Sequence, residues 1–466
     1  MTPPSVTRRL CPTRRRGPTS YIVWALIGLA APGWQAVLGD TWEVGPGRQC
    51  TRIEEAASRA QPGDVILVHS RPDGRPYEQT AVFVRQGGLT FRGVPSPGAP
   101  RVKISGEGFD YSGAGSTPRA IFQFNRGADD CLLEGFELFG AHNASHNGAG
   151  VRINQANRVT IRNCAIHGND MGIMSNGDGT LDTARDQRIE HCQIHHNGDP
   201  ADPGFNHNLY LGGTSVTLRF CEVHASLTGH NVKSRAHHTR VEYCYVHHSA
   251  NREFDLVDAA DTARPESHAV LLGNVIAKDP KCKGNRGVIH FGQDGGKEHD
   301  GTLHLVFNTI VTPFLSPVVE LSAPKAKARL VGNLVSDGGM RQSGQRIAGA
   351  RNGATLENVT GIENWFSGGF GGSGGTALEA ATNVFHRADH PLFADPSQHD
   401  YRLTPAAAKS ARARLTPDML DLPPLPGASQ PDAKPPLVWQ YRHPADKEQR
   451  PAEARLARGA YGRGEP

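Results

Sequence analysis

The stretch Val159-Thr-Ile-Arg-Asn-Cys-Ala-Ile-His167 decides the fold, because its closing phrase recurs along the chain. The four copies are Cys164-Ala-Ile-His167, Cys192-Gln-Ile-His195, Cys221-Glu-Val-His224 and Cys244-Tyr-Val-His247. The intervals between their cysteines are 28, 29 and 23 residues. Further along, asparagine takes the cysteine position, at Asn274, Asn308 and Asn333. Short apolar β runs at this period predict a parallel β-helix, in which each coil buries its apolar face against the next.

The repeat also predicts columns of equivalent side chains. Successive coils of such a fold lie about 4.8 Å apart, the ordinary spacing of paired strands. We expect the four cysteines to form an internal column that the asparagines continue. Parallel side chains at this spacing do not suit disulfides, which need Cβ atoms about 3.8 Å apart, so the thiols are interpreted as small buried apolar groups. The four histidines form another column, for which a stacked turn position is favoured over a zinc site.

Composition and length favour one elongated domain. The chain has 466 residues, 54 of them glycine, and only 7% are aromatic. This profile suits an all-β solenoid over residues 40–405, opened by a short capping helix near Ile53–Ala60. Residues 406–466 are rich in proline, alanine and charge, and they are interpreted as a strap or a disordered tail.

Residues 1–39 are interpreted as a signal peptide. Five arginines precede an apolar run, Tyr21–Ala31, which has 11 residues. A membrane-spanning helix needs about 20 apolar residues, so cleavage and export are favoured over anchoring. We therefore expect a secreted or periplasmic protein with no membrane span after cleavage.

The charge of the mature chain excludes one class of partner. The formal net charge is +4, and removal of five arginines without any acid leaves 4 − 5 = −1. A nearly neutral chain lacks the basic surface of a nucleic-acid-binding protein.

Removal of Cys11 also leaves seven cysteines, an odd number that does not favour a disulfide framework. We expect a monomer.

Several phrases resemble the bacterial right-handed parallel β-helix repeat proteins of the pectin-lyase-like superfamily. They are Val44-Gly-Pro-Gly47, Pro62-Gly-Asp-Val-Ile66, Pro391-Leu-Phe-Ala-Asp-Pro396 and Arg458-Gly-Ala-Tyr-Gly462. The resemblance covers residues 41–405, and the tail returns at 459–462. It implies a right-handed parallel β-helix that is exported and acts on a polysaccharide. The superfamily includes lyases, hydrolases, epimerases and non-enzymes, so the resemblance does not choose a reaction.

Alignment of the coils predicts an outward stripe of polar side chains along one sheet. Each member lies between two apolar residues, which point inward because strand side chains alternate. The members are Arg152, Tyr210, Lys233, Asp255 and His290, with Met174 between the first two. A neighbouring outward column is expected at Asn208, Asn231 and Glu253. A cation, a phenol, a carboxylate and an imidazole on one face suit contact with a sugar chain.

The segment Asn231–Cys244 is similar to one in alginate- and chondroitin-type β-helix lyases, in which a lysine followed by serine removes the sugar proton. This resemblance implies that Lys233 is the base of a β-elimination. Arg235 would then bind the uronate carboxylate, and Tyr210 and His290 are the candidate proton donors. The expected substrate contacts are Arg152, Asn208, Asn231, His230 and Asp258.

One position departs from that pattern and leaves alternatives open. Those lyases carry an arginine on the coil after the lysine, whereas this chain has Asp255. The carboxylate would pair with Lys233 and raise its pKa, or it would bind Ca²⁺ together with Glu253. Glu253, Asp255, Asp258 and Asp261 are also candidates for the two carboxylates of an inverting glycoside hydrolase. The third hypothesis is a glycan-binding or structural protein without catalysis.

Overall fold

In the computed structural model, the described residues are 39–113, 118–203, 205–259, 262, 264–294, 297–340, 343–371, 374–386, 392–411, 413, 415, 422–423, 438–451 and 457–461. Most of the predicted signal peptide lies outside them, so export stays a prediction of the sequence. The monomeric state stays a prediction as well. Within the described part of the chain, no helix has the length and apolar character needed to cross a membrane.

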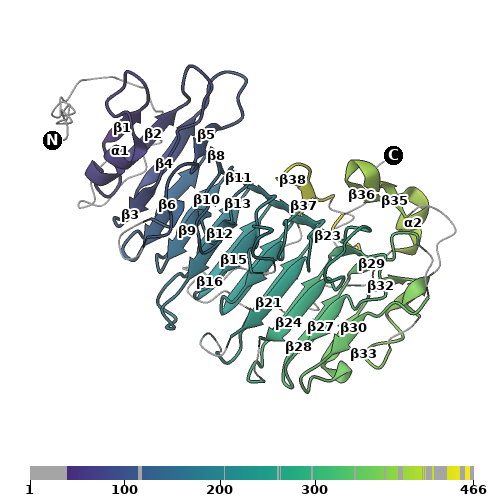
Figure 1. The fold of residues 1–466 in the computed structure, drawn as a ribbon. Coiled ribbons are helices and arrows are strands. Elements are labelled where there is room, and N and C mark those ends of the chain that lie inside the picture. The colour runs from purple at the N-terminus through teal and green to yellow at the C-terminus, as the bar shows by residue number, and fades with distance from the viewer. Residues whose placement is uncertain are drawn as a thin grey trace, which may run out of the picture.

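Three long parallel sheets form a right-handed parallel β-helix, as the repeat predicts (Figure 1). Each coil contributes in turn to the three sheets. Sheet A contains β1 (Thr41–Val44), β2 (Val65–His69), β4 (Thr90–Val94), β7 (Leu132–Glu134), β10 (Thr160–Arg162), β13 (Gln187–Glu190), β16 (Ser215–Arg219), β19 (His238–Glu242), β22 (His268–Leu272), β25 (Thr302–Val306), β28 (Lys327–Val331), β31 (Val359–Ile362) and β33 (Ala377–Leu378).

The other two sheets close the cross-section. Sheet B contains β5 (Val102–Ser105), β8 (Phe136–Phe139), β11 (Ala165–His167), β14 (Gln193–His195), β17 (Glu222–His224), β20 (Tyr245–His247), β23 (Val275–Ala277), β26 (Thr309–Val311), β29 (Leu334–Ser336), β32 (Trp365–Ser367) and β34 (Val384–His386). Sheet C contains β3 (Val82–Val84), β6 (Ala120–Asn125), β9 (Ala149–Asn154), β12 (Met171–Asn176), β15 (Leu209–Leu211), β18 (Val232–Ser234), β21 (Phe254–Asp258), β24 (Ile289–Gln293), β27 (Val319–Leu321) and β30 (Ala348–Ala350).

The predicted internal column is confirmed. The cysteines of the repeat are buried and free, and the backbone N–H of Cys164 donates to the Cys192 sulfur at 3.5 Å. At the end of the cysteine run, the N–H of Cys244 donates to Asn274 Oδ1 at 2.9 Å. Asn274 then donates its side-chain amide to Asn308 at 3.0 Å, and Asn308 does the same to Asn333. The column satisfies backbone groups at a turn that is closed to water.

A short helix caps the first coils, and a set of short elements follows the last coils in the chain. At the first coils, α1 (Ile53–Arg59) buries Ile53 and Ala56 against the core, as expected for a cap. After the last coils, β35 (Phe393–Asp395), β36 (Asp400–Leu403) and α2 (Pro405–Ser410) precede the hairpin β37 (Trp439–Arg442)–β38 (Asp446–Gln449), and these elements pack along sheet B. The short 3-10 helices are Leu356–Asn358, Gly368–Phe370 and Pro396–Gln398.

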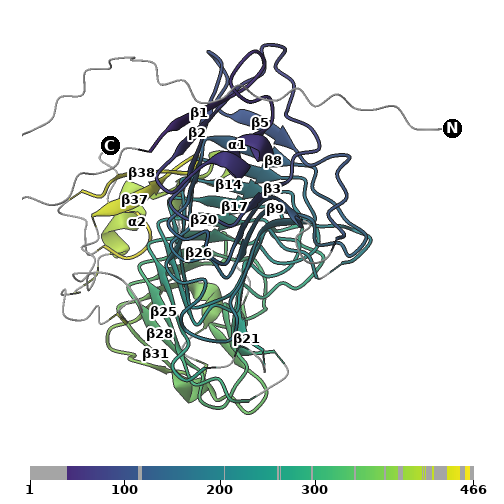
Figure 2. The same cartoon turned by 90° about the vertical axis from the view of Figure 1, so that its left-hand side faces the viewer.

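The described part of residues 406–466 is a strap on sheet B. Tyr441 packs against Tyr245 with a ring separation of 5.8 Å, and the N–H of Ala460 donates to Thr309 at 2.9 Å. Residues 459–461 therefore return to the helix as expected. Figure 2 shows β37 and β38 on the opposite side of the molecule from β9 and β21 of sheet C. The strap thus leaves the predicted polar stripe uncovered.

Candidate functional site

The predicted stripe on sheet C is in register. Tyr210 pairs with Lys233, Lys233 pairs with Asp255, and Asp255 pairs with His290. Met174 lies between Arg152 and Tyr210, as expected. Figure 1 shows β15, β21, β24 and β27 in that order along this sheet, and β18 lies between the first two. Residues from four coils therefore form one row on the outer face.

The row points away from the core, but much of it is buried. The flanking residues, such as Leu209 and Phe254, belong to the apolar core, so the alternation is as predicted. However, Lys233 is 9% exposed, Asp255 2% and His290 1%. Tyr210 is half-buried. The expectation of an open polar stripe is therefore wrong at Asp255 and His290, because side chains from neighbouring loops cover them.

Lys233 forms a buried ion-pair cluster. Its Nζ lies 2.7 Å from Asp255 Oδ2 and 3.0 Å from Asp294 Oδ2. Burial lowers the pKa of Lys233, but the charges and hydrogen bonds of the two carboxylates outweigh it, so the pKa lies above its usual value. The predicted pairing of Lys233 with Asp255 is confirmed. In this geometry Lys233 is an ammonium group.

His290 is held at both ring nitrogens. Its Nδ1 lies 2.7 Å from Asp255 Oδ1. Its Nε2 lies 2.9 Å from an Arg351 nitrogen and 2.7 Å from Ser322 Oγ. Because a guanidinium can only donate, Nε2 is an acceptor and the ring proton is on Nδ1. The expected role of His290 as a proton donor to substrate does not fit this closed geometry; His290 instead orients Asp255.

Asp255, His290 and Ser322 contact one another in the same order as the residues of a hydrolytic triad. Unlike a catalytic triad, they are not accessible to a substrate. Ser322 is 0% exposed, and its Oγ also accepts the N–H of Gln293 at 3.0 Å. A nucleophile must reach a substrate carbonyl beside an oxyanion site. Because the Ser322 hydroxyl group is fully buried, it cannot reach a substrate, and this triplet is a structural network.

Two further side chains, Arg252 and His230, lie close to Asp255. An Arg252 nitrogen lies 3.6 Å from Asp255 Oδ1, and His230 Nε2 lies 3.6 Å from Oδ2. Burial raises the pKa of Asp255, but the hydrogen bond from His290 and the charge of Lys233 hold it well below its usual value. Burial lowers the pKa of His230 to about 4. Asp255 is therefore an ionised anchor for cations, and His230 is neutral near pH 7.

Sequence analysis did not predict four residues of the site, namely Arg252, Asp294, Glu320 and Arg351. Arg252 and Arg351 both contact Glu320, at 2.7 and 3.5 Å, and Asp294 also lies 3.4 Å from Arg235. Glu320 pairs with His290 in the sheet. It is the centre of Val319-Glu-Leu321, the same apolar–polar–apolar triplet, and extension of the alignment by one coil would have found it. The other three lie outside that repeat position and had no comparable signal.

The prediction that Asn208, Asn231 and Glu253 point outward is wrong. All three are fully buried. The Asn208 amide donates to Asn231 Oδ1 at 2.8 Å, and the Asn231 amide donates to Glu253 Oε2 at 2.6 Å. Glu253 Oε1 lies 3.4 Å from Lys278 Nζ. These residues precede their strands, so they line the inside of a turn and form a second amide column.

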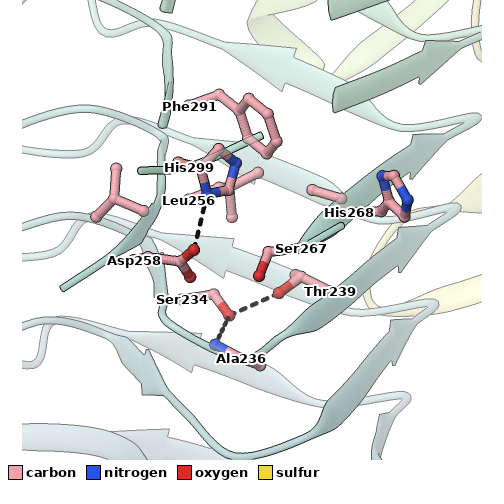
Figure 3. Close-up of a pocket in the computed structure, with 11 residues that line it drawn as sticks. Ser234, Ala236, Thr239, Leu256, Asp258, Ser267, His268, Phe291 and His299 are labelled. Atoms are coloured by element: carbon pink, nitrogen blue, oxygen red, sulfur yellow. Dashed lines mark hydrogen bonds and ion pairs between the residues drawn. The ribbon is translucent and has the colours of Figure 1, made fainter. Parts of the chain in front are cut away.

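Asp258 also lies away from the row. Its Oδ2 is 2.8 Å from His299 Nδ1, and both side chains line a small pocket with Ser234 and Thr239 (Figure 3). The expected substrate contact at Asp258 is therefore wrong in position. Asp261 lies outside the described residues. With Glu253 and Asp258 turned away from Asp255, the proposed pair of hydrolase carboxylates does not assemble from these three residues.

The residues present do not fit the predicted Ca²⁺ site. Both oxygens of Glu253 are bound by Asn231, Ser249 and Lys278. Asp255, His290 and Asp294 bring one ligand atom each within 4.8 Å of one another, but the Lys233 ammonium bridges the two carboxylates. A divalent cation would have to displace that charge.

Tyr210 joins the ion cluster to an apolar surface. Its ring lies 6.0 Å from Lys233 Nζ and 5.6 Å from the Arg235 guanidinium. On the other side, Tyr210 and Met174 pack on a small apolar cluster that contains Met171. The arrangement brings an aromatic ring and two cations, Lys233 and Arg235, together on the outer face of sheet C.

Comparisons with known proteins add no assignment of activity. The sequence matches no protein-family model and no curated protein. Among solved structures, pectate lyase Pel9A is similar at 15% identity over 91% of this chain and 96% of that chain, with a TM-score of 0.38. DFA-IIIase from Arthrobacter chlorophenolicus A6 is 12% identical over 71% and 89%, with a TM-score of 0.34. Rice weevil pectin methyl esterase is 11% identical over 78% and 87%, with a TM-score of 0.27. These likenesses carry no argument about the reaction.

Proposed function

We propose that the protein is a polysaccharide lyase that cleaves an acidic, uronate-containing glycan by β-elimination on the outer face of sheet C. The observation that carries the proposal is the position of Lys233. Its Nζ lies between Asp255 and Asp294, on the rung next to Tyr210, with Arg235 close by. These groups offer a base, an acid and a carboxylate partner on one face of sheet C, with Tyr210 and Arg235 partly exposed and Lys233 buried beside them.

In the proposed reaction, the Arg235 guanidinium binds the uronate carboxylate, which makes the proton on C5 more acidic. Neutral Lys233 removes that proton. The electron pair left on C5 forms a C4–C5 double bond, and the bond between C4 and the glycosidic oxygen breaks. The Tyr210 hydroxyl gives its proton to the departing oxygen. Asp255 and His290 position Lys233 and do not touch the substrate.

The electrostatics of the site predict an alkaline enzyme. Because Asp255 and Asp294 raise the pKa of Lys233, the neutral amine is scarce at neutral pH. The rate should therefore rise as the pH rises toward the raised pKa of Lys233.

An absorbance screen tests the proposal. Uronate-containing polysaccharides are incubated with the protein, and unsaturated product is measured near 230 nm, the absorbance expected of a β-elimination product. We expect Lys233→Ala to lower the rate by about a thousandfold. Lys233→Arg is the matched variant, because it keeps the charge and its partners but cannot be deprotonated; it should be folded and equally inactive.

Other outcomes have clear meanings. Reducing ends without an unsaturated product would contradict β-elimination in favour of hydrolysis. Retarded migration in affinity electrophoresis with no product from any glycan would favour the non-catalytic glycan-binding protein. An active Lys233→Arg variant would exclude Lys233 as the base.

A further inference from the structure

A second cationic group lies on sheet C, away from Lys233. Arg152 is the outward residue of β9, and Arg119 immediately precedes β6, the neighbouring strand. The two strands are in register, with Gln123 paired to Arg152. The N–H of Arg119 donates to Gln123 Oε1 at 2.8 Å, which fixes the backbone at this edge. Both arginine side chains are half-buried.

These two arginines have no counter-charge within the described residues. Arg119 Nε and Arg152 Nη1 are buried without a hydrogen-bond acceptor. Burial and the charge of Arg119 lower the pKa of Arg152 to about 10. The stretch just before this point, Ala114-Gly-Ser-Thr117, contains no acid in its sequence. By contrast, the nearby Arg126 and Arg158 each contact an aspartate.

Buried guanidinium donors without acceptors cost free energy, and the positive charge of Arg119 adds to the cost of charging Arg152. An anion bound on the accessible side would offset both costs, because planar guanidinium groups match carboxylate and sulfate oxygens. Arginines that only keep a protein soluble hold their charges in water. These two arginines are partly buried, so solubility alone does not explain them.

An apolar surface connects this pair to the catalytic candidates. Met174 and Tyr210 occupy the two rungs between Arg152 and Lys233, and both pack on the cluster that contains Met171. Three rungs of about 4.8 Å separate Arg152 from Lys233 by about 14 Å. A glycan with anionic groups on separate sugars would place its charges at the two ends and its rings on the middle.

We propose that Arg119 and Arg152 form an anion subsite that binds a second carboxylate or sulfate group of the glycan chain. This inference rests on the proposed function, which identifies the ligand as an acidic glycan. It adds that the glycan is a polyanion longer than one sugar. Short substrates that cannot reach from Lys233 to Arg152 should bind weakly.

Binding measurements separate this subsite from catalysis. Affinities are measured by calorimetry for polygalacturonate, dextran sulfate and neutral dextran, in a Lys233→Arg background that does not consume substrate. We expect Arg119→Gln/Arg152→Gln to weaken binding of the charged polymers by about tenfold, and less so at high salt. Lys325→Gln/Lys327→Gln is the control, since it removes two exposed charges, one at the first residue of β28 in sheet A and one two residues before it, and should leave affinity unchanged.

The outcomes are distinct. Equal weakening by both double variants would show that net charge alone matters and would overturn the subsite, and so would unchanged affinity in the arginine variant. The melting temperature should stay the same or rise, because a repulsive pair is removed; a fall with unchanged binding would show a structural role. If the native protein forms no unsaturated product but binding still depends on the arginines, the subsite stands and the lyase proposal fails.

Discussion

At the scale of single residues, Lys233 combines two opposing influences. Burial favours the neutral amine, and the carboxylates of Asp255 and Asp294 favour the ammonium form. Asp255 is held by His290 from behind, whereas Asp294 reaches Lys233 from a loop and is 37% exposed. The two partners therefore play different parts: Asp255 fixes the amine in place, and Asp294 adjusts its charge.

This division predicts the effect of Asp294→Asn. Loss of one opposite charge at 3.0 Å should lower the pKa of Lys233 by about one unit. The ascending limb of the pH–rate profile, which the deprotonation of Lys233 sets, should then move to lower pH by the same amount. The shift is measured in the absorbance assay and, independently of activity, from the side-chain NMR signal of Lys233.

Glu357→Gln serves as the control for that shift, because it removes an exposed carboxylate far along the chain. It should leave the titration of Lys233 unchanged. An unchanged profile in Asp294→Asn would contradict the assigned role of Asp294.

At the scale of elements, the coils are held together by columns of amides as well as by apolar packing. Asn308 donates to Leu271 O at 2.8 Å and to Asn333 Oδ1 at 3.0 Å, and its own oxygen accepts from Asn274. Each asparagine thereby serves three coils. Such columns keep successive strands in register, which the row on sheet C requires.

The column predicts that Asn308→Ala destabilises the protein by about 2–4 kcal/mol. The substitution leaves the N–H of Asn274 without its acceptor and Leu271 O without its donor, both in the dry interior. Urea unfolding followed by circular dichroism measures the change. Gln398→Ala, which removes an exposed amide, should cost less than about 0.5 kcal/mol; equal losses would argue against the column.

At the scale of the whole molecule, the C-terminal segments contact one end of a stack of imidazoles on sheet B. The rings of His167, His195, His224 and His247 follow one another at 5.0, 4.8 and 4.8 Å. From the strap side, His399 and His443 face the end of this stack, and Glu222 contacts His247 and His443. Burial lowers the pKa of His195 to about 4 and that of His224 to about 3, and the neighbouring imidazoles add to this effect.

The stack predicts a loss of stability in mild acid. Because the folded-state pKa values lie below the unfolded value of about 6.5, the unfolded chain takes up protons first as the pH falls. Stability is therefore complete above about pH 6.5 and declines as the pH drops toward 4 and 3. Melting temperatures at a series of pH values should show this decline, and His195→Gln/His224→Gln should make it smaller.

His386→Gln provides the comparison, since His386 lies on β34 and not in the stack. It should retain the acid sensitivity of the native chain. A decline that is equally steep in the double variant would mean that other groups cause it.

The sequence by itself determined the solenoid, its register and the row on sheet C. The reason is that period and alternation are local properties: a strand residue points in or out according to its neighbours, and the repeat length places it above its equivalent. Tyr210, Lys233, Asp255 and His290 could therefore be aligned without coordinates. The cysteine and asparagine column followed from the same argument.

Only the tertiary structure decided which of these side chains reach solvent and which partners they have. Asn208, Asn231 and Glu253 precede their strands, where alternation no longer applies, and the turn directs them inward. Asp294, Arg252 and Arg351 come from the loops around the row, and the path of a loop depends on distant contacts that no period records. These loop residues bury Asp255, and the carboxylate of Asp294 favours the protonated form of Lys233. The loops therefore set the chemistry of the site, and the repeat sets its position.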